Sequence, residues 1–258
     1  MPRLYPLYSS SKGNCSYIGT RSGGILIDCG VSCRKVQQAL AANEIPVSAV
    51  RGIFITHEHS DHIKGLKMFT KTYNIPVYAQ SGTLDFLYDK EQIMSRAVEI
   101  SGGTEIGDML VEPFDTMHDA ASPCGYRITS GDSVCAVCTD LGTVTDRVRK
   151  GVCGASAVLL EANYDEDMLK NGPYPYELKQ RISCDIGHLS NRQSGEFASE
   201  LLDSGTQSIV LAHLSENNNT PEAAWSAVEG ILRRDGHEHG RDHMLTVAAP
   251  DGCRYVSF

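Results

Sequence analysis

The sequence has 258 residues, 41% of them hydrophobic, which fits a single domain over residues 1–258 with a substantial core. No apolar run is long enough to span a membrane, no signal peptide stands at the start, and nine scattered cysteines argue against a disulfide framework, so we expect a cytoplasmic protein with no membrane partner. The formal net charge of −9 argues against a generally basic surface, so a nucleic acid substrate would require metal ions and a local positive patch.

The pattern of apolar residues, turns and caps predicts two strand-rich halves with helices between the strands. In chain order the first half gives strands at 4–8, 16–19 and 24–27, a helix at 32–43, a strand at 52–56, a helix at 62–73, a strand at 76–79, a helix at 81–90, and strands at 97–100, 110–117, 125–130 and 133–139. The second half gives a strand at 155–161, helix 191–203, strand 208–212, helix 220–234, and strands at 244–248 and 254–258. Two mixed sheets with helices outside, an αββα sandwich of the α+β class, account for this order.

A histidine-rich segment, FITHEHSDH, follows a buried apolar run. His57 and His59 are two apart, so in extended backbone they point the same way, and Asp61 and His62 follow where a helix begins. Imidazole and carboxylate are ligands that Zn, Mn and Fe all accept. The segment predicts two ligand pairs for two divalent ions, whereas an isolated His-x-His is more often a solvated helix start.

Three further predicted strands each end in a residue that can bind a metal. These residues are His118, Asp140 and His213. Each alone would be interpreted as a cap or a surface residue. Four such strand ends in one chain favour a shared site at the rim of the sheets.

Five motifs carry a resemblance to a known superfamily. ILIDCG, THEHSDH, the strand-end His118, TDLG and LAHLS occur in this order. They resemble the motifs of the metallo-β-lactamase-fold hydrolases over nearly the whole chain, and His-x-His-x-Asp-His is the most specific of them. The resemblance implies an αββα hydrolase with two divalent ions, which could be Zn, Mn or Fe.

The resemblance also assigns the ligands. The first ion would be held by His57, His59 and His118, the second by Asp61, His62 and His213, and Asp140 would bridge the two. Asp28 would orient a ligand histidine, and Asp61 would be essential for catalysis. Two cations in such a set would lower the pKa of a shared water, giving a hydroxide nucleophile, and stabilise charge on an attacked phosphoryl or carbonyl group.

Three segments indicate which hydrolase this is: SSSKGNCSY at 9–17, CDIGHLSN at 184–191 and LAHLSENNNTPE at 211–222. Together they are similar to the YycJ (WalJ)-like subfamily, which implies a DNA exonuclease acting from 5′ ends. The histidine of GHLS also resembles an extra histidine of the tRNA 3′-processing endonucleases.

That histidine, His188, is surplus as a ligand because seven residues already serve two ions. An isolated histidine more often packs at a helix start, but phosphodiester hydrolysis needs an acid to protonate the leaving sugar oxygen. We hypothesise that His188 is the general acid or a phosphate ligand. Weaker candidates for phosphate contacts, each equally well explained by turn and cap chemistry, are Asn14, Ser190, Asn191, Asn217 and Asn218.

A second histidine-rich segment, HEHGRDH, occupies residues 237–243. No buried strand precedes it, and Gly236 and Gly240 make it flexible, so metal binding there would carry an ordering cost. We interpret it as a solvated connection in preference to a metal site.

Three functions remain open. The leading hypothesis is a dinuclear phosphodiesterase acting on DNA from 5′ ends. The second is a thioesterase or lactonase of the same fold, which the acidic charge supports. The third is a non-catalytic metal-binding accessory of a signalling pathway, disfavoured because such a protein has no chemical need for an open site with seven ligands. Nothing in the sequence indicates an oligomeric state.

Overall fold

The computed structural model describes residues 1–89, 97–252 and 255–258, and in that part of the chain the strands form two mixed sheets of seven. The first sheet consists, in spatial order, of β14 (Val256–Ser257), β1 (Arg3–Tyr8), β2 (Cys15–Thr20), β3 (Gly23–Ile27), β4 (Val50–Phe54), β5 (Val77–Ala79) and β6 (Ala97–Glu99). The second consists of β13 (Met244–Val247), β12 (Ser208–Ala212), β11 (Ala157–Glu161), β10 (Ser133–Cys138), β9 (Cys124–Ser130), β8 (Met109–Asp115) and β7 (Thr104–Ile106).

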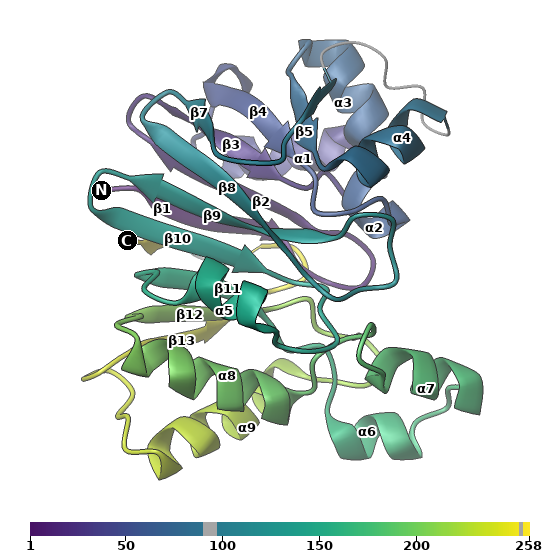
Figure 1. Cartoon of the computed structure of the whole chain (residues 1–258), viewed down its shortest axis with the longest axis vertical. Helices are drawn as coiled ribbons and strands as arrows, with labels where there is room; N and C mark the ends of the chain where they lie inside the picture. Colours follow the sequence, from purple (N-terminus) through teal and green to yellow (C-terminus); the bar gives the residue numbers. More distant parts are fainter. Residues whose placement is uncertain (90–96, 253–254) are drawn as a thin grey trace.

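Helices cover the outer faces of both sheets, which confirms the predicted αββα arrangement (Figure 1). The first sheet is covered by α1 (Cys33–Ala42), α3 (Leu66–Tyr73) and α4 (Ser81–Asp89), and the second by α5 (Asp146–Val152), α8 (Asn191–Asp203) and α9 (Pro221–Arg234). Shorter connecting helices are η1 (Val47–Ala49), α2 (Ser60–Ile63), α6 (Glu166–Asn171) and α7 (Tyr176–Ser183). Among the described residues, no helix combines the length and apolar content needed to cross a bilayer.

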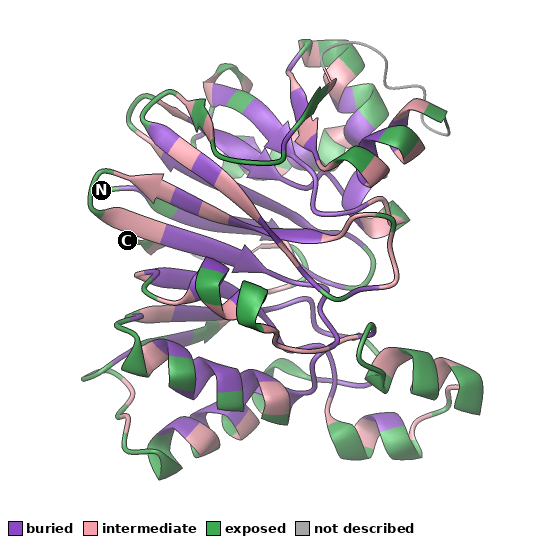
Figure 2. Ribbon diagram, viewed as in Figure 1, coloured by how far each residue is buried: buried purple, intermediate pink, exposed green. Residues whose placement is uncertain are grey.

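The core has three layers of apolar contact, one between the sheets and one under each set of helices. Between the sheets, the Phe54 ring meets the edge of the Tyr126 ring, with 5.5 Å between centroids. Strand β10 serves two of these layers, because Cys135 faces the opposite sheet and Cys138 lies under the helices. The strands are accordingly buried along much of their length (Figure 2), and every cysteine that the structure describes is a free thiol.

Parallel strands bring their carboxyl ends to one edge of each sheet. Strands β3 and β4 pair in parallel in the first sheet, as do β10, β11 and β12 in the second. Buried polar residues follow these strands closely: Asp28 after β3, His57 after β4, Asp140 after β10 and His213 after β12. The topology therefore gathers side chains that are far apart in sequence, as ligand sites in such sheets require.

Two predicted elements differ from the structure for reasons visible in their backbone bonds. The helix predicted at 62–73 is divided into α2 and α3, because Gly65 N donates to Cys29 O (2.8 Å) rather than continuing one helix. The strand predicted at 52–56 ends at Phe54, because Thr56 N donates to the Asp28 carboxylate (2.8 Å).

Other departures concern short or exposed elements. The prediction omitted β7, α5, α6 and α7, and of these β7 and α7 have no buried residue at all. Two predicted ends, residue 90 of the helix at 81–90 and residue 254 of the strand at 254–258, lie outside the described residues.

Candidate active site and metal centre

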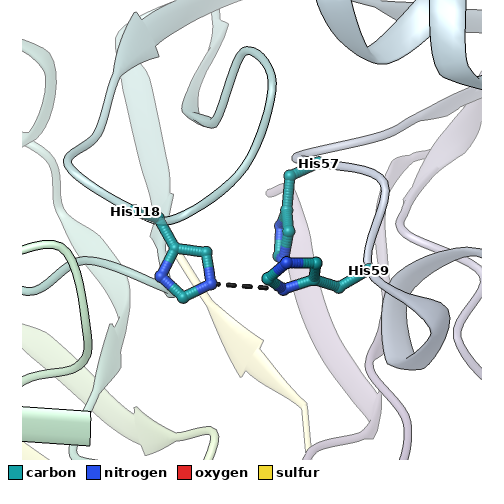
Figure 3. Close-up of side chains that lie close together, drawn as sticks. All are labelled: His57, His59 and His118. Carbon is teal, nitrogen blue, oxygen red and sulfur yellow. Dashed lines mark hydrogen bonds between the residues drawn. The ribbon is translucent and has the colours of Figure 1, made fainter. Parts of the chain in front are cut away.

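Three histidines converge between the two sheets (Figure 3). His57 and His59 come from the loop after β4, and His118 comes from the loop after β8. One ring nitrogen from each lies within 4.8 Å of the others, and His118 Nε2 is 3.3 Å from His59 Nδ1. His118 Nδ1 faces the Gly187 carbonyl (3.0 Å), so a proton on Nδ1 leaves the Nε2 lone pair directed at the other two rings.

A second group lies directly beside the first. Asp61, His62 and His213 also bring one ligand atom each within 4.8 Å of one another. The Asp140 carboxylate stands between the groups, since Oδ2 is 3.3 Å from His62 Nε2 and Oδ1 is 3.8 Å from His118 Nε2. The structure thus brings all seven predicted ligands together, with Asp140 within 4 Å of a histidine from each group.

Asp28 contacts His62 through the ring nitrogen that points away from the other ligand candidates. Its carboxylate is 2.8 Å from His62 Nδ1 and accepts bonds from Thr56 N (2.8 Å) and Thr56 Oγ1 (2.9 Å). A carboxylate that takes the Nδ1 proton fixes the ring so that Nε2 points into the site. Asp28 thus contacts a predicted ligand histidine, and its supporting role stays a prediction.

Three of these strand-end residues adopt left-handed backbone conformations. The φ angles are 61° at Asp28, 58° at Asp140 and 56° at His213. Such conformations cost roughly 1–3 kcal/mol each outside glycine and cluster at functional sites. Here they turn side chains at the ends of β3, β10 and β12 toward the shared centre.

The pKa of Asp140 is lowered, whereas the pKa values of the two imidazoles closest to it, His62 and His213, are raised. Burial opposes ionisation of Asp140, but His213 and His62 outweigh it and hold the pKa of this carboxyl well below its usual range. Burial likewise opposes a charge on His213, but the Asp140 carboxylate raises the pKa of that ring to about 9. For His57, burial and then the neighbouring His62 lower the pKa well below its ordinary value, so this ring is neutral.

The site's donors fit divalent metal ions. Although His57 is buried, its Nε2 has no hydrogen-bond partner, and an unpaired polar atom in such a position costs about 1–3 kcal/mol. A neutral imidazole with a free lone pair beside further imidazoles and carboxylates is a ligand set for Zn, Mn or Fe. The residues present therefore match the metals that the sequence implied.

His188 lies at the edge of the same centre, and its partner was missed in the sequence. Its ring centroid is 5.1 Å from that of His118 and 5.3 Å from that of His213. His188 Nδ1 is 2.7 Å from Oε1 of Glu161, which is fully buried at the end of β11. The other oxygen of Glu161 accepts bonds from the backbone of Leu141 (3.2 Å) and Leu189 (3.1 Å). Applying the strand-end argument to 155–161 would have identified Glu161.

The centre opens into a cavity of about 180 Å³. Its lining includes ligand candidates and His188, together with Ser11, Asp119, Arg181, Ile182 and Gly187. Arg181 Nε donates to Asp119 Oδ2 (2.7 Å), and the other oxygen of Asp119 is 3.4 Å from His118 Nε2. Arg181 remains largely exposed and places a positive charge at the cavity mouth. Arg181 lies on α7, a helix with no buried residue, and no motif in the sequence pointed to it.

Asn14 lies inside the site, but it contacts ligand candidates. Its Nδ2 is 3.3 Å from Asp61 Oδ2 and 3.1 Å from His62 Nε2. None of the phosphate candidates is among the described residues that line the cavity, neither Asn14 nor Ser190, Asn191, Asn217 and Asn218.

The side chains of the last four residues bind other protein groups. Ser190 caps α8 by accepting a bond from Gln193 N (3.2 Å), and Asn191 donates to the side chain of Asn219 (3.0 Å). Asn217 donates to the Tyr174 hydroxyl (2.8 Å), and Asn218 Nδ2 is 3.4 Å from Ser215 Oγ. A phosphate contact by any of them stays a prediction.

Gly30 is required where three backbone segments meet. Asn14 N donates to Asp61 O (2.8 Å), and Gly30 N donates to Asn14 O (2.8 Å). A Cβ atom at Gly30 would lie 1.6 Å from Asp61 O, so alanine cannot fit unless the backbone carrying Asp61 moves.

We expect Gly30→Ala to lower the free energy of unfolding by about 1–3 kcal/mol and to weaken metal binding, as measured by denaturant unfolding and metal content. Gly102→Ala, at a position with open space around its Cβ, is the control and should change neither. Unaltered metal content in Gly30→Ala would contradict the expectation.

Comparisons with known proteins agree with this geometry. A model of the β-lactamase superfamily domain matches residues 24–214. Exodeoxyribonuclease YycJ of Bacillus anthracis is 36% identical over 257 residues, which cover 97% of each chain. Exodeoxyribonuclease WalJ of Streptococcus pneumoniae serotype 2 is 34% identical over 251 residues, which cover 95% of this chain and 93% of that protein.

Among solved structures, the metallo-β-lactamase fold protein YhfI from Bacillus subtilis superposes with a TM-score of 0.74, over 99% of this chain and 98% of that one. At 15% identity this likeness establishes a shared fold. The chain belongs to the β-lactamase superfamily, and it is a metal-dependent hydrolase with the metallo-β-lactamase fold.

Proposed function

We propose that this chain is a dinuclear phosphodiesterase, a DNA exonuclease that prefers 5′ ends. The observation that supports it most is His188, an imidazole beside the ligand set that has a buried carboxylate partner of its own. Thioester hydrolysis has less need of such a group, because thiolates leave without a proton. The exodeoxyribonuclease names of two relatives at 34–36% identity support DNA as the substrate and, with it, a cytoplasmic location.

The proposed ligands divide between the two halves of the cluster. His57, His59 and His118 would hold one ion, Asp61, His62 and His213 the other, and Asp140 would bridge them. When bound, the ions supply an activated water and positive charge toward the phosphoryl oxygens. Asp28 and Asn14 keep the ligands oriented, through His62 and Asp61.

His188 provides the proton in this proposal. Glu161 occupies His188 Nδ1, so Nε2 is the atom left to serve a substrate in the cavity. A protonated imidazole there can protonate the sugar oxygen as the phosphorus–oxygen bond breaks. Since Glu161 is fixed by two backbone N–H groups, it holds the ring of His188 in place.

Arg181 is the cavity residue best suited to contact DNA. Its guanidinium is exposed at the mouth, where it can meet a phosphate as well as Asp119. Local charge of this kind is compatible with a net charge of −9, because an exonuclease holds a few phosphates at a chain end rather than a long duplex.

A substrate comparison tests the proposal. Metal-loaded protein is incubated with 5′-phosphorylated duplex DNA, the same duplex with a 5′-hydroxyl, single-stranded DNA, RNA and a thioester, and products are separated by size. We expect mononucleotides from the 5′ ends of DNA, and no release by Asp61→Ala. Cleavage of the thioester alone, or DNA release that persists in Asp61→Ala, would refute the proposal.

A further inference from the structure

The second histidine-rich segment, residues 237–243, is more ordered than its sequence suggested. Much of the segment is exposed, as expected of a solvated connection, but His243 at its end is only 3% exposed. The segment turns back on itself through bonds from Gly240 N to His243 O (2.8 Å) and from Asp242 N to Glu238 O (2.9 Å). The two glycines thought to make it flexible have positive φ angles, 98° at Gly236 and 79° at Gly240, so they permit tight turns instead.

This turn places two imidazoles next to a buried carboxylate. Glu229 lies on α9 and is 3% exposed, and its Oε2 is 3.1 Å from His243 Nε2. His239 completes the group, with one ligand atom from each residue within 4.8 Å of the other two. The rings of His239 and His243 are 5.5 Å apart, and Trp225 packs edge-on against His239 (5.7 Å).

Protein contacts leave this group incompletely satisfied. Glu229 Oε1 and His243 Nδ1 are both buried and have no hydrogen-bond partner, although the Arg233 guanidinium lies 3.6 Å from Glu229 Oε1. Two such atoms in one pair cost about 1–3 kcal/mol each. The His239 ring accepts a long hydrogen bond from Leu245 N (3.4 Å), which a metal ion could replace.

The group is separate from the proposed active site. Strand β13 begins directly after His243 and runs parallel to β12. The start of β13 therefore lies beside the amino end of β12, whereas His213 follows the carboxyl end of β12 on the opposite side of the sheet (Figure 1).

We propose that Glu229, His239 and His243 form an additional metal site that binds one divalent ion of the Zn²⁺ class, independently of the ions proposed for catalysis. Two imidazoles and one carboxylate are a donor set that Zn²⁺ accepts, with the remaining position open to water. The partly exposed His239 gives the ion access from solvent. A bound ion ties α9 to the start of β13, which is the edge strand of its sheet, and so has a structural role.

Zinc binding by untagged protein tests the site. Chelator-treated wild type, His239→Ala and His237→Ala are dialysed against buffered Zn²⁺, and bound metal is counted. His239→Ala is expected to bind one equivalent less than wild type. His237→Ala, which alters the same segment outside the group, is expected to match wild type. The difference does not depend on how many ions the active site holds, so it is informative even if the proposed exonuclease activity fails.

Hydrogen exchange locates the lost ion. Zn²⁺ is expected to slow exchange across residues 236–244 in wild type and in His237→Ala, but not in His239→Ala. Because His239 is at the surface, its replacement should leave the fold and any DNA hydrolysis intact. Equal zinc content in wild type and His239→Ala, or a lost equivalent without a change in local exchange, would overturn the proposal.

Discussion

Asp140→Ala is expected to lose both metal binding and hydrolysis. The carboxylate lies between the two halves of the cluster, with His213 Nδ1 at 2.9 Å on one side and His118 Nε2 at 3.8 Å on the other. Its removal takes away the proposed bridging donor and the nearest carboxylate partner of the buried His213 ring. A loss of several kcal/mol in transition-state stabilisation corresponds to ~10³-fold or more in rate.

Metal content and DNA release measured on the same preparation check this expectation. Asp132→Ala removes an exposed carboxylate on the turn between β9 and β10 and is the matched control, with no effect on either quantity. Asp140→Ala protein that keeps its full metal content would show that Asp140 does not bridge the ions.

His188→Ala is expected to separate catalysis from metal binding. The fold and the seven proposed ligands remain, so metal content should equal that of wild type. Without a group to protonate the leaving sugar oxygen, kcat should fall by ~10²–10⁴-fold. Glu161→Gln, which keeps the shape but removes the charge that holds the ring, should lower kcat in the same direction by a smaller factor.

The leaving group of the substrate identifies what His188 does. A phosphodiester with a nitrophenolate leaving group needs no acid, so the defect of His188→Ala should largely disappear on that substrate. An equal defect on both substrates would assign His188 to phosphate binding instead. Loss of metal from His188→Ala would place His188 among the ligands. It lies close enough to Asp140 and His213 to bind an ion together with them.

The sequence predicted the parts of the fold that long apolar patterns specify. Strands such as β4, β10 and β12 are buried runs, and their ends could be located to within a few residues. The short helices α6 and α7 could not, because their burial depends on neighbours and their own sequences carry little apolar periodicity. Similarly, the residues around Gly65 do not indicate that its backbone N–H bonds to Cys29 O and so divides the predicted helix.

The same distinction applies to the site. Residues in a motif, such as His57 and Asp61, could be recognised because spacing alone places them together. Glu161 and Arg181 act through contacts with residues far along the chain, which only the folded arrangement reveals. For the segment at 237–243, the two glycines and the lack of a preceding strand predicted flexibility. The folded chain instead places His243 against Glu229 of α9, a contact that the local sequence does not indicate.

The proposed ligands come from both sheets, and this gives the ions a mechanical role. His57, His59, Asp61 and His62 belong to the first sheet's loops, whereas His118, Asp140 and His213 belong to the second. Ions held by both sets cross-link the halves of the sandwich at one edge, much as a disulfide joins two segments, but reversibly. Because an ion that binds only the folded state stabilises it by mass action, a cell's supply of metal would regulate how long this protein survives as well as how fast it works.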